Sequence, residues 1–256
     1  MNRLENKVAI VTGGGAGIGK ATAELFAEEG ATVVIAERNE ASGKETAAAI
    51  KIRGGKALHV TTDVADEASV EAMVAEAARA FGRIDILVNN AAVFVLRGIE
   101  ATVEEWHEIL GVNVIGPALV AKHAVPHMQR AGGGAIVNLA SISSFIAQPL
   151  FVTYNATKAA VASMTRCMAL DLADSNIRVN AVGPGAVWTQ IVERLTRESG
   201  MDRAAADAHP DWGGAHMLKR IAEPREIAAA ILFLASDDAS FVTATTLMVD
   251  GGYTAK

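Results

Sequence analysis

Short runs of consecutive apolar residues alternate along the chain with longer segments in which apolar residues recur every three or four positions. The first pattern predicts strands that are buried on both faces, and the second predicts amphipathic helices. We expect seven strands, over 8–11, 32–36, 57–61, 84–88, 135–139, 177–182 and 246–249. We expect helices over 18–29, 41–53, 67–81, 102–130, 154–173 and 224–235, with Asp66 capping the third and a bend near 116–117 in the fourth.

This alternation of strands and helices is typical of the α/β class. Each strand–helix–strand unit is expected to be right-handed, which makes the strands parallel and places helices on both faces of one sheet. The chain shows no linker, internal repeat or low-complexity tract. It therefore predicts a single domain over 1–256, built on a doubly wound, seven-stranded parallel sheet.

One stretch, 190–222, breaks this rhythm. It carries Gly200, Pro210, Gly213 and Gly214 among helical pieces, and it has no strand pattern. A long insertion beside the carboxyl edge of a sheet is usually functional. We interpret the segment as a lid over a substrate site, with a plain surface excursion as the alternative.

A glycine-rich run joins the first predicted strand to the first predicted helix, where residues 12–19 read TGGGAGIG. Glycines let the backbone turn tightly and approach a pyrophosphate, whose negative charge is stabilised at a helix N-terminus. A plain strand-to-helix turn needs one glycine rather than five. The position of the run inside a strand–helix–strand unit predicts a Rossmann dinucleotide-binding loop.

The spacing of this run, Thr-Gly-three-Gly-one-Gly, resembles that of the short single-domain branch of the short-chain dehydrogenase/reductase family. Further matching motifs follow in order within residues 4–254: Asp63-Val64, Asn89-Asn90-Ala91-Ala92, Asn113, Ser141, Tyr154, Lys158, Pro184-Gly185, Thr189 and Asp250-Gly251-Gly252. The resemblance implies an NAD(P)-dependent oxidoreductase that acts on CH–OH groups. Ala92 and Ala244 stand where the family often has glycine, and neither change removes a reacting group.

The resemblance also implies which residues bind the dinucleotide. They are Gly13, Gly15, Gly17, Ile18, Gly19, Glu37, Arg38, Asp63, Val64, Asn89, Ala91, Tyr154, Lys158, Pro184, Gly185, Val187 and Thr189. In Rossmann folds a carboxylate about 20 residues after the glycines accepts hydrogen bonds from the ribose 2′-hydroxyl, and it would repel a 2′-phosphate. Glu37 holds this place, and Ala16 stands where NADP-binding relatives often have a basic residue. We therefore expect NAD as the cofactor, with NADP kept open by Arg38.

The predicted helix over 154–173 begins with a pair of residues suited to proton transfer. Hydride transfer to or from an alcohol carbon needs a proton moved on or off the oxygen. Tyr154 and Lys158 share a helix face, and a nearby cation lowers the pKa of a phenol from about 10. We expect Tyr154 to be the general acid/base and Lys158 to tune it. By resemblance, Lys158 also holds the nicotinamide ribose, Ser141 orients the substrate oxygen, and Asn113 bends its helix and holds a water near the lysine.

The substrate pocket is expected to be walled by Val93, Ser143, Phe145, Gln148 and Trp188, together with Phe94, Phe151 and the 190–222 segment. Such a mixed, largely apolar site suits a cyclic, steroid-like, aromatic or sugar-derived secondary alcohol or ketone. We expect hydride transfer between NAD(H) and such a small molecule. One alternative is an NADPH-dependent 3-oxoacyl-carrier-protein reductase-like enzyme, whose acidic carrier would dock on Arg194, Arg197, Arg203 and Arg220. The other is a non-catalytic dinucleotide-sensing protein.

Composition narrows the partners and the compartment. A formal net charge of −6, with no basic block, argues against a nucleic-acid partner. The single cysteine, Cys167, cannot form an intramolecular disulfide, which favours a reducing compartment and hence the cytoplasm. We expect it to be a small core residue of its helix. No run approaches 18 apolar residues and residues 1–7 are polar, so we expect neither a membrane span nor a signal peptide.

Four histidines and two long helices complete the predictions. His123 and His127 lie four apart, but Pro126 separates them and the sequence offers no acidic partner nearby, so we expect no metal site. His209 and His216 lie in the lid, where either could touch substrate, and we expect them to be solvated loop residues. The resemblance implies that the helices over 102–130 and 154–173 pair between subunits, so we expect a homotetramer, with a dimer as the second choice.

Overall fold

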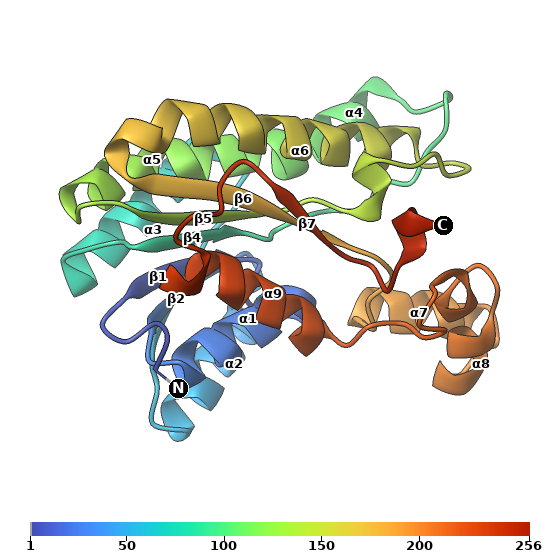
Figure 1. Ribbon diagram of the computed structural model, residues 1–256, viewed down its shortest axis with the longest axis horizontal. Coiled ribbons are helices and arrows are strands. Elements are labelled where there is room, and N and C mark those ends of the chain that lie inside the picture. Colours follow the sequence, from blue (N-terminus) through green and yellow to red (C-terminus); the bar gives the residue numbers. More distant parts are fainter. Residues whose placement is uncertain (1) are drawn as a thin grey trace.

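The computed structural model describes residues 2–256 and confirms the predicted seven-stranded parallel sheet (Figure 1). The strands are β1 (Val8–Thr12), β2 (Thr32–Glu37), β3 (Lys56–Thr61), β4 (Ile86–Asn89), β5 (Gly134–Leu139), β6 (Ile177–Pro184) and β7 (Thr246–Val249). They lie in the order β3-β2-β1-β4-β5-β6-β7. The chain changes direction of winding between β1 and β4, and ligands of open α/β sheets bind beyond the carboxyl ends of the strands at such a point.

Helices cover both faces of the sheet. They are α1 (Gly17–Glu28), α2 (Glu40–Ile52), α3 (Glu67–Phe81), α4 (Val103–Leu110), α5 (Gly116–Arg130), α6 (Val152–Leu172), α7 (Gln190–Glu198), α8 (Arg203–Ala208) and α9 (Pro224–Ala235). α1, α2 and α9 lie on one face, and α3, α5 and α6 lie on the other (Figure 1). Successive side chains of a strand point to opposite faces, so β1 contributes Val11 to the core around Phe26 and Ile10 to the core around Met73.

Two helix starts follow directly from local sequence. The predicted cap at Asp66 is confirmed, since its carboxylate accepts a hydrogen bond from the backbone N–H of Ser69 at 3.2 Å. α4 begins with a capping box, in which the Thr102 hydroxyl and the Glu105 carboxylate each accept from the other residue's backbone N–H. These bonds satisfy amides that the first helical turn leaves unpaired.

The helix predicted over 102–130 is interrupted one turn earlier than expected. α4 and α5 are joined by a π-helical turn, Gly111–Ile115, instead of a bend at 116–117. The backbone N–H of Gly116 donates to the carbonyl of Gly111, five residues back. Pro117 has no N–H to donate to the carbonyl of Asn113, so the regular α-helical bonding cannot pass through this point. The wider turn carries Asn113 into the interior, where its side chain is buried.

The 190–222 segment consists of α7, α8 and a short 3-10 turn, Gly213–Ala215. A parallel bridge between Val187 and Ala222 closes its base. The two helices stand beyond the carboxyl ends of β6 and β7, beside the C-terminus of the chain (Figure 1). This position suits the predicted lid, whose function remains a prediction.

The prediction that Cys167 is a core residue is wrong, because Cys167 is exposed. The buried face of α6 runs through Val161, Thr165 and Ala169, four residues apart, and leaves position 167 on the outer side. Apolar neighbours in the sequence do not place a residue in the core when they lie on the other face of its helix.

The helical segment Val103–Arg130 is long and apolar enough, by length and composition, to cross a membrane. Polar residues interrupt it, so it contains no unbroken apolar run. In the fold, α5 turns Val120, Ala121, Ala124 and Met128 into the core beside the sheet. A core helix passes the same compositional test as a membrane span, so this property alone does not identify one.

Candidate active site

The glycine loop lies at the carboxyl end of β1 and is tied to the end of β4. The Thr12 hydroxyl accepts hydrogen bonds from the backbone N–H groups of Asn90 and Ala91, both at 3.0 Å. The Asn90 amide donates to the carbonyls of Thr12 at 2.9 Å and Gly13 at 3.1 Å. Sequence reasoning assigned no role to the Thr12 and Asn90 side chains, because their bonds depend on β1 and β4 being neighbours. They fix the loop against the sheet.

The loop has the close backbone packing that a pyrophosphate site needs. A Cβ on Gly13 would lie 3.0 Å from the Ala91 Cα, and one on Gly19 would lie 2.1 Å from the Gly13 carbonyl oxygen. Gly13 and Gly17 also have positive φ angles, 63° and 52°, which glycine adopts without strain. α1 starts after Ala16 with no side chain capping its first amides. Free amides at a helix N-terminus beside a glycine turn fit the phosphates of a dinucleotide.

Glu37 lies next to this loop at the end of β2. Its carboxylate accepts hydrogen bonds from the backbone N–H of Gly15 at 3.1 Å and of Asn39 at 2.9 Å. The two bonds hold the carboxylate at the mouth of the loop, where the sequence placed a ribose hydroxyl. Arg38 is exposed, and it forms no ion pair within the described part of the chain.

Other predicted cofactor residues fall into two groups. Asp63 follows β3, where its backbone N–H donates to the Ser69 hydroxyl and its carboxylate accepts from the N–H of Ala65. Side chains of the second group face the protein interior: Val64 belongs to the core, and the Asn89 amide donates to the Asn138 side-chain oxygen at 2.9 Å. Val64 is left with its backbone to serve a ligand, whereas the Asn89 side-chain oxygen is buried and has no hydrogen-bond partner among residues 2–256.

The loop after β6 carries the remaining residues predicted to bind the cofactor. The Gly185 N–H donates to the Val249 carbonyl at 3.2 Å, and the Thr189 hydroxyl caps α7 by accepting from Val192. A Cβ on Gly17 would lie 3.2 Å from the Thr189 methyl carbon, so the base of the lid touches the glycine loop. Pro184, which ends β6, and Val187 lie in the same segment.

Tyr154, Lys158 and Ser141 meet beyond the carboxyl end of β5, as the sequence predicts. Tyr154 and Lys158 are 7% and 4% exposed, and the Lys158 ammonium lies 5.6 Å from the centre of the Tyr154 ring. Ser141 hydrogen-bonds the phenol, which lowers the Tyr154 pKa, whereas burial raises that pKa by more. The Lys158 ammonium donates to the Leu139 carbonyl at 2.7 Å, and its predicted tuning of the phenol stays a prediction.

Asn113 bonds the backbone of Val93, in the predicted pocket wall that follows β4. Its side-chain oxygen accepts from the Val93 N–H at 2.8 Å, and its amide donates to the Val93 carbonyl at 3.0 Å. The same amide lies 3.3 Å from the Thr157 hydroxyl, which donates to the Tyr154 carbonyl. The π-helical turn thus joins the helix of the reacting tyrosine to the residues after β4. The water relay inferred from the family stays a prediction.

Aromatic rings surround the phenol. The Phe94 ring stacks on the Tyr154 ring with centroids 4.9 Å apart and planes 16° apart. Phe151 meets the same ring edge-on at 6.2 Å. Phe94 and Phe145 keep large exposed areas. The predicted pocket wall therefore keeps apolar surface that a substrate could contact.

The lid is fastened to the body at Trp188 and His216. The Arg203 guanidinium of α8 lies 4.7 Å from the Trp188 ring centre and donates to Asp207, Glu223 and the Ile221 carbonyl. His216 is buried, contrary to the prediction of a solvated histidine. One ring nitrogen accepts from the Ala186 N–H at 3.1 Å, and the other lies 3.0 Å from the Trp212 carbonyl. The sequence did not indicate these His216 contacts, because they depend on the close approach of the lid to the backbone at 185–186.

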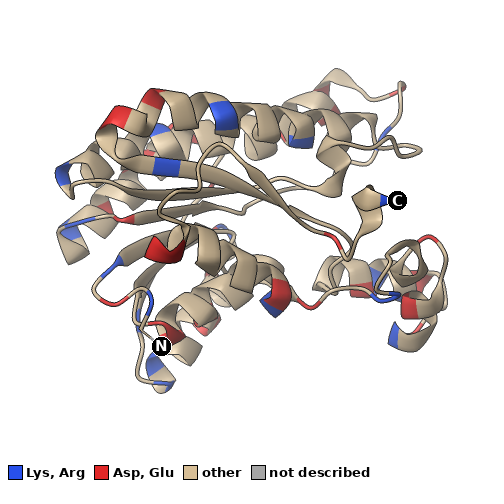
Figure 2. Cartoon of the chain, viewed as in Figure 1, with Lys and Arg blue, Asp and Glu red and all other residues tan. Residues whose placement is uncertain are grey.

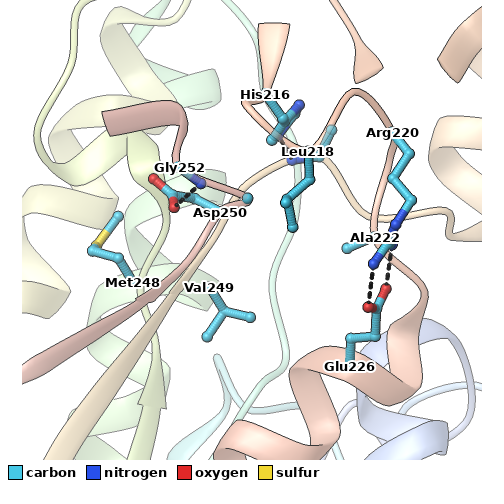
Figure 3. Close-up of a pocket in the computed structure, with 11 residues that line it drawn as sticks. His216, Leu218, Arg220, Ala222, Glu226, Met248, Val249, Asp250 and Gly252 are labelled. Carbon is cyan, nitrogen blue, oxygen red and sulfur yellow. Dashed lines mark hydrogen bonds and ion pairs between the residues drawn. The ribbon is translucent and has the colours of Figure 1, made fainter. Parts of the chain in front are cut away.

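The C-terminal residues hold the same part of the lid. The Tyr253 ring meets His216 edge-on at 5.4 Å, the Leu218 N–H donates to the Gly251 carbonyl, and the Lys256 ammonium donates to the Ala215 carbonyl. A cavity of about 220 Å³ lies between this contact, the end of β7 and the start of α9. Figure 3 shows His216 and Asp250 on one side of it and the Arg220–Glu226 ion pair on the other. The cavity is separate from the tyrosine, lysine and serine described above.

His123 has an acidic partner that the sequence did not suggest. Its ring lies 3.1 Å from the carboxylate of Glu67 on α3, and Lys122 donates to the same carboxylate. Within residues 2–256 no group of three or more histidine, cysteine, aspartate or glutamate side chains is placed to hold a metal ion. The contact therefore reads as an ion pair between α3 and α5.

Replacing Lys158 by methionine should stabilise the cofactor-free protein at neutral pH and abolish that advantage in alkali. Burial lowers the Lys158 pKa from 10.5 to about 8, so the unfolded chain binds more protons than the folded one between these values. The free energy of unfolding of the wild type therefore rises by up to roughly 3 kcal/mol as pH rises through that window, because the cost of burying the charged lysine disappears. Urea unfolding of both proteins at about pH 7 and about pH 10 measures the difference. A constant difference between the two pH values would contradict the expectation.

Comparison with known proteins agrees with this geometry. A family model described as enoyl-(acyl carrier protein) reductase matches residues 13–254. The chain is 45% identical to a cis-4-hydroxycyclohexanecarboxylate dehydrogenase of Sinomonas cyclohexanicum over 97% of each chain. It is 39% identical to a cyclopentanol dehydrogenase of Comamonas sp. over 100% of each chain. It is 40% identical to a meso-2,3-butanediol dehydrogenase of Serratia marcescens, over 99% of this chain and 96% of the relative.

These relatives cover 97% or more of the chain, and the family model covers residues 13–254, which include the glycine loop, Ser141, Tyr154 and Lys158. The chain belongs to the short-chain dehydrogenase/reductase family, whose members use a nicotinamide dinucleotide to interconvert alcohols and carbonyl compounds.

Proposed function

We propose that this protein is an NAD(H)-dependent dehydrogenase that interconverts a secondary alcohol carried on a small ring and the corresponding ketone. The observation that carries the proposal is the buried Tyr154, hydrogen-bonded to Ser141 and flanked by Lys158 and Phe94. The relatives named for cyclohexane and cyclopentane alcohols support a ring substrate. The exposed aromatic surface of Phe94 and Phe145 suits the carbon skeleton of such a ring.

The chain's own residues supply the proton chemistry. When bound, the nicotinamide dinucleotide supplies the hydride acceptor for oxidation or the hydride donor for reduction. In oxidation, Ser141 holds the carbinol oxygen and the Tyr154 phenolate takes its proton; in reduction, the Tyr154 phenol returns it. The Ser141 hydrogen bond lowers the Tyr154 pKa against the larger opposing effect of burial, and burial lowers the pKa of the Lys158 ammonium to about 8. The residues predicted for the cofactor fit this task because the glycine loop and Glu37 lie on the same edge of the sheet.

The test is a panel of secondary alcohols, including cyclopentanol and cyclohexanol, assayed with NAD by the absorbance of NADH. Turnover of ring alcohols supports the proposal. If the purified protein binds NADH but converts no alcohol or ketone of the panel, it is a dinucleotide sensor instead. Greater kcat/KM with NADPH than with NADH would overturn the choice of cofactor.

The choice of NAD is based on the Glu37 carboxylate, and Glu37→Gln tests it. Glutamine keeps the length of the side chain and one oxygen for the Gly15 or Asn39 N–H, but it removes the charge that repels a 2′-phosphate. We expect the ratio of kcat/KM for NADP to that for NAD to rise by about tenfold, a change of roughly 1.4 kcal/mol. Steady-state kinetics with both cofactors measure it. An unchanged ratio would show that Glu37 does not select the cofactor.

A carrier-protein substrate receives less support from the surface. Each of the four lid arginines faces a carboxylate: Arg194 faces Glu198, Arg197 faces Glu193, Arg203 faces Asp207 and Glu223, and Arg220 faces Glu226. Acidic and basic residues therefore alternate over the lid (Figure 2). An acidic carrier protein needs an uncompensated basic surface to dock on, and these pairs remove most of it.

We also propose that the protein is a homotetramer of the cytoplasm. Exposed apolar side chains on the outer faces of the π-helical turn and α6, Ile115 and Leu170, support pairing of these helices between subunits. A single cysteine supports a reducing compartment. A stable monomer in light scattering would overturn the tetramer, and a stable dimer would favour the second choice.

A further inference from the structure

We propose that Gln148 determines specificity by donating hydrogen bonds to a second oxygen atom of the substrate, at a distance from the carbon that is oxidised. The inference rests on the proposed function, since it assumes that an alcohol binds at Ser141 and Tyr154. It adds a substrate class: ring alcohols that carry a further hydroxyl, carbonyl or carboxylate group.

The Gln148 amide has a defined orientation, set by its bond to Ser143. The Ser143 hydroxyl, which is 4% exposed, donates to the Gln148 side-chain oxygen at 2.6 Å. This bond occupies the oxygen end of the amide. The –NH₂ end forms no hydrogen bond with residues 2–256, and the side chain is only half-buried, so two N–H donors remain for a ligand.

The loop that carries Gln148 is fixed beside the reacting residues. The Ser143 N–H donates to the Ser141 hydroxyl oxygen at 3.1 Å, so Ser143 contacts both the residue that orients the reacting oxygen and Gln148. On the other side, the Gln148 carbonyl accepts from the N–H of Phe151, whose ring meets Tyr154 edge-on. Asn155, next to Tyr154, donates to the Ile146 carbonyl at 2.8 Å. These bonds hold the amide close to the reaction centre.

A fixed donor pair near an otherwise apolar wall is a selective device. Removing an oxygen from the substrate leaves the amide facing a group that cannot accept its hydrogen bonds, and sites built in this way discriminate strongly against the analogue that lacks the oxygen. The amide is neutral, so it accepts a hydroxyl, a carbonyl or a carboxylate as partner. The two N–H donors of Gln148 require an oxygen acceptor on the substrate, whether that oxygen is charged or neutral.

The experiment compares cyclohexanol, cyclohexane-1,4-diol and cis-4-hydroxycyclohexanecarboxylate as substrates of the full-length protein with NAD. In the wild type we expect kcat/KM for the diol or the hydroxycarboxylate, which carry a second oxygen-containing group, to exceed that for cyclohexanol by about tenfold or more. In Gln148→Leu this preference should fall about tenfold, because leucine fills the space without donating. Gln148→Glu separates the two acceptors: it should harm the carboxylate much more than the diol, because like charges repel.

Gln129→Leu is the matched control, since the Gln129 amide also bonds a serine hydroxyl, that of Ser175, but at the end of α5 that leads into the start of β5, whereas the pocket loop follows the other end of β5. It should leave the substrate preference unchanged. If Gln148→Leu lowers kcat/KM by the same factor for all three substrates, Gln148 has only a structural role and the inference is wrong. If the wild type prefers cyclohexanol, the inference is also wrong although the proposed function stands. If the wild type oxidises none of the three but binds NADH, the proposed function fails first.

Discussion

Tyr154→Phe should lower kcat/KM for alcohol oxidation by roughly three orders of magnitude, within the range of 10²–10⁴ that general acid–base catalysis contributes. Phenylalanine keeps the stack on Phe94 and the edge contact with Phe151, so the fold and the pocket wall should remain. It removes the one hydroxyl that Ser141 contacts and that can accept the proton of the substrate. Stopped-flow or steady-state NADH absorbance measures the rate, and titration of NADH fluorescence measures whether the cofactor still binds.

The second tyrosine provides a matched control. Tyr253 packs its ring against His216 near the C-terminus. Tyr253→Phe removes the same atom but keeps the ring contact with His216, so it should change kcat/KM by no more than about twofold. Full activity in Tyr154→Phe would overturn the mechanism, and equal losses in both variants would show that the assay reports folding rather than proton transfer.

Gly19→Ala should weaken NADH binding by about a hundredfold, a loss of roughly 3 kcal/mol. Its new Cβ would lie 2.1 Å from the Gly13 carbonyl oxygen and 2.4 Å from the Asn90 amide nitrogen, distances that real atoms do not adopt. Relief requires the glycine loop to move away from α1, which breaks the Asn90 bonds that hold it to β4. Fluorescence titration measures the binding, and thermal unfolding shows how much of the loss is shared with stability.

Gly111→Ala is the control for adding a methyl group to a helical glycine. At Gly111 φ is −54°, and the nearest atom to a new Cβ is the Ala65 Cβ at 3.7 Å. Alanine there should be neutral or stabilise the protein by up to about 1 kcal/mol, because it restricts the unfolded chain and suits a helix. Undiminished NADH binding by Gly19→Ala would show that the loop tolerates a side chain, and the phosphate site would have to lie elsewhere.

Much of this fold could be predicted because its signals are local. The apolar runs of β1, β2 and β5 are buried on both faces, so their strands are visible as short hydrophobic segments. Tyr154 and Lys158 meet because a helix brings residues four apart to one face, and Glu37 lies at the loop because a strand end follows a fixed geometry. The Tyr154–Lys158 contact needs only the helix, and the Glu37 contact needs only that β1 and β2 of one strand–helix–strand unit are neighbours.

What could not be predicted depends on contacts between distant parts of the chain. The Lys158 ammonium bonds the Leu139 carbonyl, and a backbone acceptor carries no residue-specific signal. Asn89 faces Asn138 only because β4 and β5 are neighbours in register. His216 is buried because the lid folds back onto the backbone at Ala186, which no periodicity in the lid sequence reveals.

The attachment of the chain's last residues to the lid has a practical consequence for handling the protein. Tyr253 and Lys256 contact the lid at His216 and Ala215, while Arg3 and Leu4 bond Asp238 and Glu29, outside the lid. A purification tag fused after Lys256 would pull on the residues that fasten the lid, and kinetic constants measured with it would describe a perturbed enzyme. Tags belong at the other end of the chain, where an extension leaves the contacts of Tyr253 and Lys256 with the lid intact.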